Sequence, residues 1–386
     1  MKSLKQWGVF AFAIVATSGL ASAQVQLGID TGGDEKPQYA LAAANSEGDA
    51  AEAEATDPAP IYQMSPCGSS CSTGCAPMGC TQSCGSCGQR VQPWIFADYL
   101  YLSATDVDTN YTIPVNALGT TGTPVGAAAF ASPGYDSGFR VGGGWGLDGC
   151  TSIVGTYWWF ESEESDAVAL DPAVSGTTQF LSPVLFDPAT INVTGESARA
   201  EAFYDIDFQM VDLAVQRIIS CGCSHEISAF AGARWGQLDQ ELRTNYSILG
   251  GTTVDSTIDF DGIGPRLGLN GEFRTDSGFF AYGQGAGNFL VGTFDADFLQ
   301  QNTFAGIQSN TSFEDDRIVS VLELELGVGW QTSGGMLRVR GGYYISSWFN
   351  AMTMPEVIAG VHDRNLNDVS ESLTFNGLTT RLELRF

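Results

Sequence analysis

The sequence predicts an all-β protein, an antiparallel transmembrane β-barrel of about ten strands with a disordered N-terminal leader. The last segment, residues 378–386, alternates aliphatic and charged side chains and ends on the aromatic residue Phe386, as outer-membrane barrel strands do. Runs with the same two-residue period recur from Trp94 onward, which is the pattern of half-buried strands. The connections between these runs are alternately short and long, as the two rims of such a barrel require.

Three segments are expected before the barrel. Residues 1–23 hold Lys2 and Lys5, an apolar run and an Ala-Ser-Ala site, the three parts of a secretory signal peptide. Residues 24–66 are rich in Ala, Glu, Asp and Gly, so we expect a flexible acidic linker that cannot bury enough apolar surface to fold. A cysteine-rich segment, residues 67–92, then leads into the barrel, residues 93–386.

The cysteine-rich segment holds an even number of cysteines, which in an exported chain first indicates disulfides. These would close within the segment or link the chain to another copy or to a wall partner. A metal site is the alternative, because Cys84 and Cys87 have the two-residue gap common in zinc sites, but no histidine lies near them. We expect no metal and no cofactor. The six disulfide candidates are Cys67, Cys71, Cys75, Cys80, Cys84 and Cys87.

Ten strands are expected in the barrel. Two of them carry local irregularities. The apolar parity changes between Met210 and Asp212, which indicates a bulge, and Pro265 cannot donate a ladder hydrogen bond, so we expect an interruption there. The predicted strands cover residues 94–102, 139–148, 151–160, 204–215, 227–237, 258–274, 279–294, 318–330, 337–348 and 378–386.

Short connections alternate with long polar ones, such as the loop expected over residues 295–316. Short turns are typical of the periplasmic rim and long loops of the extracellular rim. A soluble sandwich is the alternative, but it gives no reason for every second connection to be long. The expected partners are outer-membrane lipid around the apolar face and the barrel assembly machinery at the strand that ends in Phe386.

Charged side chains on the inward parity predict a lumen that carries both signs. Such rows either brace the wall by ion pairing or line a narrow water path, and a ten-stranded barrel is only slightly wider than the eight-stranded kind whose interior is filled. Acidic residues in the predicted loops would favour cations along such a path. The candidate pore-lining residues are Arg140, Asp205, Asp207, Arg234, Arg266, Glu272, Glu323, Glu325, Arg338, Arg340, Arg381 and Glu383.

Other chemistry is weaker. The net charge of −27 argues against nucleic acid as a partner. His225 beside a short turn and His362 in a long loop would lie at opposite rims, so they would not share a catalytic site, and no enzyme activity is expected. Cys150, Cys221 and Cys223 lie at short turns of neighbouring strands, which predicts a disulfide between these turns.

Three strand phrases resemble a known family. They are Ile258–Leu269 (IDFDGIGPRLGL), Leu322–Gly327 (LELELG) and Leu337–Tyr343 (LRVRGGY). Together they are similar to the pore-forming outer membrane proteins related to the Legionella major outer membrane protein, over residues 94–386. The resemblance implies an outer-membrane barrel described as pore-forming, and it brings no catalytic residues.

The sequence thus predicts a passive, porin-like barrel that lets small solutes, with a preference for cations, cross the outer membrane. The alternative is a non-conducting structural anchor whose cysteine-rich leader crosslinks to neighbours or to the cell wall.

Overall fold

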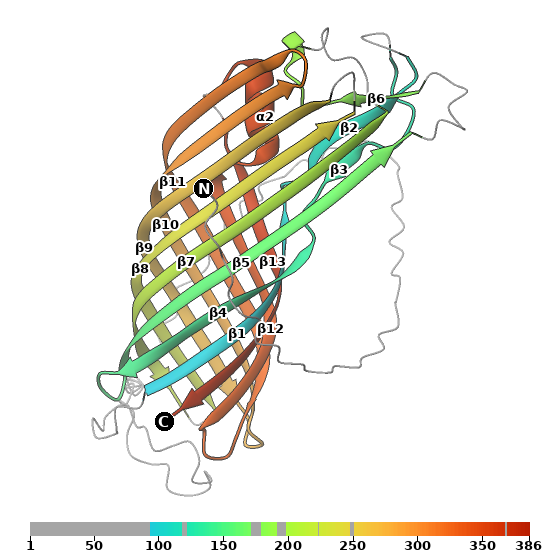
Figure 1. Ribbon diagram of the computed structural model, residues 1–386. Coiled ribbons are helices and arrows are strands. Elements are labelled where there is room, and N and C mark those ends of the chain that lie inside the picture. Colours follow the sequence, from blue (N-terminus) through green and yellow to red (C-terminus); the bar gives the residue numbers. More distant parts are fainter. Residues whose placement is uncertain are drawn as a thin grey trace, which may run out of the picture. The chain divides into compact units, whose positions relative to one another are not determined.

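The computed structural model describes residues 93–117, 122–170, 179–190, 198–222, 224–247, 251–366 and 369–386 (Figure 1). Within these residues, ten antiparallel strands close into a barrel in the order β1-β13-β12-β11-β10-β9-β8-β7-β5-β4. The predicted fold class and strand number are therefore confirmed. The predicted signal peptide, acidic linker and cysteine-rich segment lie outside the described residues. No described helix is long and apolar enough to cross a bilayer.

The barrel strands are β1 (Pro93–Thr105), β4 (Tyr135–Gly146), β5 (Thr151–Ala169), β7 (Arg199–Cys221), β8 (His225–Tyr246), β9 (Thr252–Arg274), β10 (Phe279–Asn302), β11 (Gly306–Gln331), β12 (Leu337–Ala351) and β13 (Glu371–Arg385). A separate sheet, ordered β3-β2-β6, consists of β2 (Thr109–Val115), β3 (Ala129–Ala131) and β6 (Phe180–Pro183). The long connections also hold the 3-10 helix η2 (Pro188–Thr190) and the α-helix α2 (Met354–Asp363).

The first and last barrel strands complete the wall. β1 pairs with β13 from Trp94↔Arg385 to Thr105↔Thr374 and, on its other side, with β4. The Phe386 N–H donates to the Pro93 carbonyl oxygen at 3.1 Å. Because an open sheet edge in hydrocarbon would leave backbone groups unsatisfied at several kcal/mol each, closure is what allows this sheet to sit in lipid.

The strands are longer than a membrane requires. β11 contains 26 residues, whereas a spanning strand needs about 9–11. At roughly 3.3 Å per residue and a tilt of about 40°, β11 extends roughly 60 Å along the barrel axis, about twice the hydrocarbon thickness.

This length overturns part of the predicted loop pattern. Only three residues separate β10 from β11, and five separate β8 from β9. The predicted long loop over residues 295–316 is an extended hairpin, so the strict alternation of short and long connections is wrong. The outward side chains of this extension are polar, so its alternation is the reverse of that of a strand in lipid. Polarity alone therefore predicts a loop there.

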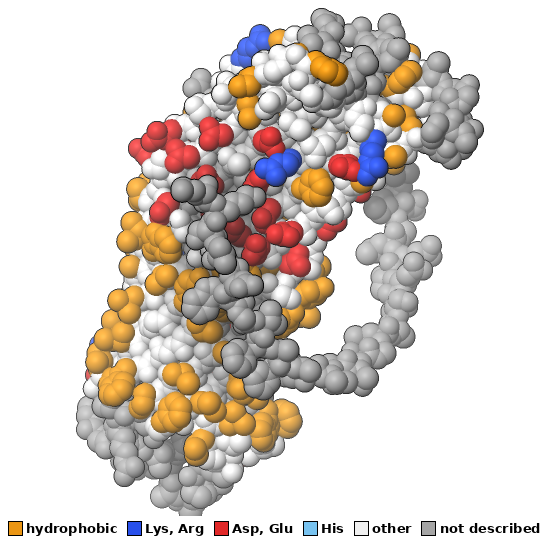
Figure 2. Space-filling model, in the orientation of Figure 1, with side chains coloured by type: hydrophobic (Ala, Val, Ile, Leu, Met, Phe, Trp, Pro, Cys, Tyr) orange, Lys and Arg blue, Asp and Glu red, His pale blue; other side chains and the backbone are white. Residues whose placement is uncertain are grey.

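The outer face of each long strand changes its chemistry along its length. On β7, Val211, Leu213 and Val215 are exposed near the short turns, while Asp205 and Asp207 lie on the same face farther along. On the face that Figure 2 shows, apolar side chains cover the lower part of the barrel and acidic side chains gather above them, with further apolar patches at the top. We call the level of Val211, Leu213 and Val215 the lipid belt and the level of Asp205 and Asp207 the acidic collar.

The inner face changes in the opposite sense. On β7, Asp212 faces the lumen at the level of the lipid belt, whereas Tyr204, Ile206 and Phe208 face it at the level of the acidic collar, all of them buried. The β5–β7 ladder runs without a register shift from Thr151↔Arg217 to Ala169↔Arg199. The bulge predicted between Met210 and Asp212 is therefore wrong, because the side-chain parity is constant and only the surroundings of each face change.

The interruption predicted at Pro265 is confirmed on one side of its strand. The β9–β10 ladder lacks pairs between Asn288↔Arg266 and Val291↔Ile263, whereas the β8–β9 ladder continues through Ala233↔Pro265. Proline removes one donor, and this donor belongs to the β10 side.

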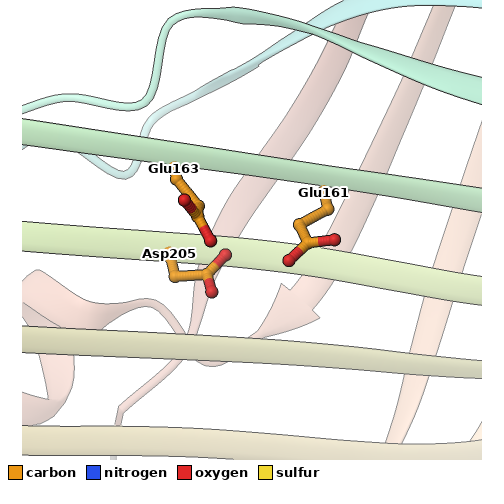
Figure 3. Close-up of side chains that lie close together, drawn as sticks. All are labelled: Glu161, Glu163 and Asp205. Carbon is orange, nitrogen blue, oxygen red and sulfur yellow. The ribbon is translucent and has the colours of Figure 1, made fainter. Parts of the chain in front are cut away.

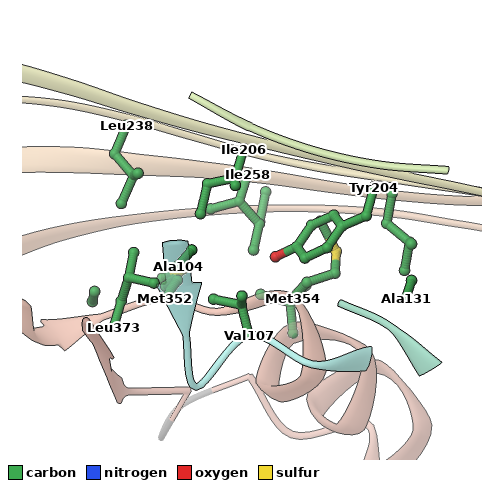
Figure 4. Packing of buried hydrophobic residues seen from close by; sticks show 14 of the residues in the cluster. Ala104, Val107, Ala131, Tyr204, Ile206, Leu238, Ile258, Met352, Met354 and Leu373 are labelled. Atoms are coloured by element: carbon green, nitrogen blue, oxygen red, sulfur yellow. The ribbon is translucent and has the colours of Figure 1, made fainter. Parts of the chain in front are cut away.

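A hydrophobic plug fills the lumen at the level of the acidic collar. Figure 4 shows Val107, Met352 and Met354 packed among side chains of the wall such as Ile206 and Ile258. The plug is formed by the connections: α2 from the β12–β13 connection, and β2 and β3 from the β1–β4 connection. At this level the barrel is packed like the core of a soluble protein.

Helix α2 was not predicted, although its sequence carries the usual signals. Thr353 occupies the N-cap position in extended conformation, and a proline lies in the first turn, where its missing N–H costs nothing. Val357, Ile358 and Val361 form one buried face. The helix ends at Arg364 in the left-handed region (φ 56°), whose N–H donates to carbonyl oxygens of the last turn, a common helix end.

The change of chemistry along β11 gives a direct test. Leu324→Arg places a charge in the lipid belt and should lower the free energy of unfolding by about 2–4 kcal/mol. Ser312→Arg is the matched control, because Ser312 is exposed on the same face of the same strand but in the acidic collar, and it should cost less than about 1 kcal/mol. Urea unfolding in phospholipid vesicles measures both, and equal losses would contradict the assigned membrane level.

Candidate functional site in the barrel lumen

Ten of the twelve predicted pore-lining residues lie on the inner face of the barrel, at the level of the lipid belt. Asp205 and Asp207 do not. Their strand neighbours Tyr204, Ile206 and Phe208 are buried in the lumen, so both carboxylates point outward. The prediction for these two residues is wrong because it assumed that polar residues face inward along the whole strand, whereas outside the membrane the outer face is the wet one.

One ion-paired cluster joins four strands around Asp98. Arg140 pairs through Nε with Asp98 and through Nη2 with Glu325 at 2.8 Å. Arg381 donates two hydrogen bonds to Asp98, at 2.5 and 2.7 Å. The strand register sets this arrangement, because Asp98 lies directly opposite Arg140 on one side and Arg381 on the other.

A second cluster centres on Glu323. Arg234 pairs with Glu323 at 2.5 Å and with both carboxylate oxygens of Asp212, at 2.5 and 2.7 Å. Arg266 pairs with the other Glu323 oxygen at 2.5 Å, and the Tyr344 hydroxyl also donates to Glu323, at 2.8 Å. All these side chains are buried, so each charge depends on its partners for stability.

Trp158 joins the two clusters. Its ring centroid lies 4.2 Å from the Arg140 Cζ atom and 5.5 Å from the Arg234 Cζ atom. Its indole N–H donates to Asp212 Oδ2 at 3.0 Å. These contacts are cation–π interactions and a charge-assisted hydrogen bond, and Trp158 is only 1% exposed.

Sequence reasoning missed Asp98, Asp212, Trp158 and Tyr344. Asp98 has the inward parity of Phe96 and Leu100, and Asp212 keeps that of Tyr204 once no bulge is assumed. Parity alone could therefore have placed the two aspartates. No signal in the sequence distinguishes Trp158 from an aromatic residue that faces lipid.

A third group of ion pairs lies near the short turns. Glu272 accepts from Arg274 at 2.5 Å and also pairs with Arg338. Arg385 pairs with Glu383 at 2.6 Å, and its side chain is 41% exposed. These pairs are therefore more accessible to water than the two inner clusters.

A cavity of about 180 Å³ lies between the inner clusters and this rim. Arg338, Arg340 and Arg381 line it together with Tyr282, and the exposed Arg385 belongs to its lining at the rim. The cavity thus faces the end of the barrel that carries the short turns and the C-terminus (Figure 1).

On the other side of Trp158 the lumen is packed. The rings of Phe160, Phe208 and Phe375 lie 4.8–5.8 Å apart, centroid to centroid. They come from β5, β7 and β13, and each is at most 1% exposed. This aromatic group is continuous with the hydrophobic plug.

A family model described as the Legionella pneumophila major outer membrane protein precursor matches residues 92–386. The chain belongs to this family. The resemblance seen in the three strand phrases is thereby confirmed, and the barrel is an outer-membrane protein.

Solved structures are similar to this member of the Legionella major outer membrane protein family at low identity and low TM-score. The outer membrane protease OmpT from Escherichia coli is 13% identical, covers 76% of this chain and 97% of its own, and has a TM-score of 0.44. The P. putida toluene transporter TodX is 9% identical, covers 77% of this chain and 91% of its own, and has a TM-score of 0.28. The Ralstonia pickettii toluene transporter TbuX is 8% identical over 77% and 90%, also at 0.28. No curated protein matches the chain.

The outer wall of this family member carries a row of carboxylates just beyond the lipid belt. Six strands contribute one carboxylate each, and every neighbouring pair in the row is directly opposite in the strand register. The row is Glu161, Asp207, Asp239, Asp259, Asp295 and Glu314. The row concentrates negative charge on the outer wall. Like charges that face each other across strands repel, so the row is destabilising.

Asp205 shows this repulsion most clearly. Its carboxylate and those of Glu161 and Glu163 lie within 4.8 Å of one another (Figure 3). Partial burial, followed by the charges of Glu161, Glu163 and Glu241, raises the pKa of Asp205 to about 6. Three carboxylates at this spacing have the geometry to share a cation.

The two short turns with Cys150 and Cys221 are neighbours, as predicted, and the Ile218 N–H donates to the Cys150 carbonyl oxygen at 2.9 Å. Cys150 is a free thiol, so the predicted disulfide between Cys150 and Cys221 is wrong. Cys221 lies three residues beyond Ile218, roughly 10 Å along the strand, whereas a disulfide requires Cα atoms within about 7 Å. Cys223 and the six leader cysteines lie outside the described residues.

His225 and His362 lie at opposite ends of the barrel, as predicted. His225 begins β8 at the short-turn rim. His362 lies in the last turn of α2, where its Nε2 atom is 3.2 Å from the Leu185 carbonyl oxygen. The two rings therefore share no site.

Glu323 tests the inner ion pairs. Glu323→Gln leaves Arg234 and Arg266 buried without their shared charge partner, so the free energy of unfolding should fall by about 3–5 kcal/mol. The matched control is Glu241→Gln on the outer wall, where Glu241 and its partner Arg243 are each about half exposed, and the loss should be under about 1 kcal/mol. Urea unfolding in vesicles distinguishes them, and similar small losses would show that the inner pairs are solvated.

Asp205 gives a prediction for pH. Its pKa is about 6 in the folded protein and about 3.9 when unfolded, so the folded state holds the proton more strongly. The contribution of Asp205 to stability therefore falls as pH rises from about 4 to 6. Asp205→Asn should reduce this fall, whereas Asp276→Asn, in the turn between β9 and β10, should leave it unchanged. Thermal unfolding at pH 4.5 and 7.5 measures the difference, and an identical fall in Asp205→Asn would contradict the prediction.

Proposed function

We propose that this outer-membrane barrel is a narrow, passive channel for small charged solutes, with no catalytic activity, and that the hydrophobic plug closes it. The observation that carries the proposal is the charged cavity of about 180 Å³ at the level of the lipid belt. A barrel that served only as an anchor would not need charges there. Replacing buried ion pairs with apolar residues of the same volume is often neutral or stabilising for the folded state.

The position of the plug supports this proposal. The plug is built from α2, β2 and β3, which belong to the long connections and not to the barrel wall. The wall keeps its own ladder of hydrogen bonds along all ten strands. The connections can therefore move without breaking the barrel, as loops that gate a site do.

The cation preference predicted from the sequence is not part of the proposal. The carboxylates of the acidic collar lie on the outer wall and do not face the lumen. On the inner face of the lipid-belt level, eight arginines stand against seven carboxylates. The arginines are Arg140, Arg234, Arg266, Arg274, Arg338, Arg340, Arg381 and Arg385, and the carboxylates Asp98, Asp212, Glu226, Glu272, Glu323, Glu325 and Glu383.

A non-conducting structural anchor is the second candidate. The observation that favours it is the packed aromatic group of Phe160, Phe208 and Phe375 beside the plug. In this function the cysteine-rich leader would crosslink the chain to neighbours or to the wall.

Two partners belong to both candidates. Lipid surrounds the lipid belt in either case. The barrel assembly machinery would recognise the last strand, whose terminal Phe386 is 64% exposed and lies at the short-turn rim.

Conductance in planar bilayers separates the two functions. Trp158→Ala removes the ring that joins the inner clusters below the plug, so each opening of the plug should give a severalfold larger single-channel conductance than in the wild type. Trp145→Ala is the control, since Trp145 is 58% exposed on the outer face of β4, and it should conduct like the wild type. Heat-modifiable mobility in electrophoresis confirms that each variant is folded. Folded protein that gives no current steps, with or without Trp158, would exclude the channel and favour the anchor.

A further inference from the structure

The lumen cavity contains a positive charge that the ion pairs do not neutralise. Arg340 lies directly opposite Arg381 in the β12–β13 register, so two guanidinium groups face each other on the inner wall. Like charges in this relation are destabilising unless something lies between them or beside them. The side chains of Arg340 and Arg381 are only 16% and 12% exposed.

The Arg340 side chain has no hydrogen-bond partner among the residues that the structure describes. Its Nε and Nη2 atoms are buried and unpartnered. The nearest carboxylate atom is Glu325 Oε1, at 3.8 Å from Nη2, which is too long for a hydrogen bond. A buried donor left without an acceptor costs about 1–3 kcal/mol, and more when it is charged.

Neighbouring acids are already committed. Glu325 accepts from Arg140 at 2.8 Å, from the Tyr282 hydroxyl at 2.8 Å and from Thr379 at 3.3 Å. Asp98 serves both Arg140 and Arg381. The protein therefore supplies no free carboxylate for Arg340 among the described residues around the cavity.

The guanidinium group of Arg340 is nevertheless held in place. Its Cζ atom lies 4.5 Å from the centroid of the Tyr282 ring, so one face of the group rests on the ring. The Nε of Arg338 is also buried and unpartnered, and Arg338 lines the same cavity. Arg338 and Arg340 thus line the cavity and carry buried N–H donors that have no acceptor among the described residues.

We propose that this cavity binds a small soluble oxyanion of the inorganic phosphate class, held by Arg340 with Arg338 and Arg381 beside it. The planar fork of a guanidinium group can donate to two oxygens of such an ion at once, and one added negative charge offsets the excess of eight arginines over seven carboxylates. About 180 Å³ is ample space for phosphate. The closed wall separates the cavity from lipid headgroups, so the ligand enters from the short-turn rim.

This inference does not depend on conduction, because binding requires access from one rim only. The test is isothermal titration calorimetry of inorganic phosphate into the full chain, folded in a phosphate-free maltoside detergent at low ionic strength. The wild type should bind one phosphate per barrel with saturation. Arg340→Gln should weaken binding by roughly tenfold or more, and Arg340→Lys, which keeps the charge and loses the fork, should fall between the two.

Arg243→Gln is the matched control, since Arg243 lies on the outer wall and is 55% exposed, and it should bind phosphate like the wild type. Folding of each variant is checked by heat-modifiable mobility, and Arg340→Lys carries the comparison if the glutamine variant does not fold. No saturable binding to the wild type would overturn the inference. So would equal binding by the wild type and the Arg340 variants. A barrel that binds phosphate and gives no current steps would keep this site and exclude the proposed channel.

Discussion

The need to pair every backbone N–H and C=O group in hydrocarbon determines this structure. A closed ladder of ten strands meets that need, and the longer strands continue their pairing well beyond the lipid. The same strand face therefore meets lipid at one level and water at another. On β7 this appears as Val211, Leu213 and Val215 followed by Asp207 and Asp205 on one face, with the inner face changing in the opposite direction. Backbone pairing continues at both levels of the wall. The side chains, and not the backbone, show where the membrane lies.

The inner face shows how the barrel solves two different packing problems. At the collar level, connections fold inward and supply apolar groups, so Ile206 and Ile258 have a core to pack against. At the membrane level none of the connections that the structure describes reaches the lumen, and inward side chains must satisfy one another across it. Arg234 and Glu323, from strands on different sides of the lumen, do so at 2.5 Å. Such buried pairs contribute less to stability than to a single register, because a shift of one residue would separate every partner.

The fold class, the strand number and most lumen residues follow from two-residue periodicity. At the membrane level apolar side chains face outward and polar side chains face inward on every strand that the periodicity identifies. The parts beyond the membrane could not be found by that rule. Asp205 was placed inside because polar was equated with inward, and residues 295–316 became a loop for the same reason. The pairing partners were also out of reach: parity puts Arg340 in the lumen, but only the register shows that it faces Arg381 and not a carboxylate. Helix α2 carries ordinary start and end signals, and a long polar context concealed them.

The abrupt boundary between aliphatic and acidic side chains on the outer wall fixes how deeply the protein is immersed. Sliding outward would expose leucines to water, and sliding inward would drag the row of facing carboxylates into hydrocarbon, so neither movement is open to a rigid cylinder. When the surrounding bilayer is thinner or thicker than the belt, the lipids must stretch or compress to meet it. The height of the lipid belt thus sets the bilayer thickness that costs least around the barrel. The protein is expected to favour membrane regions of that thickness.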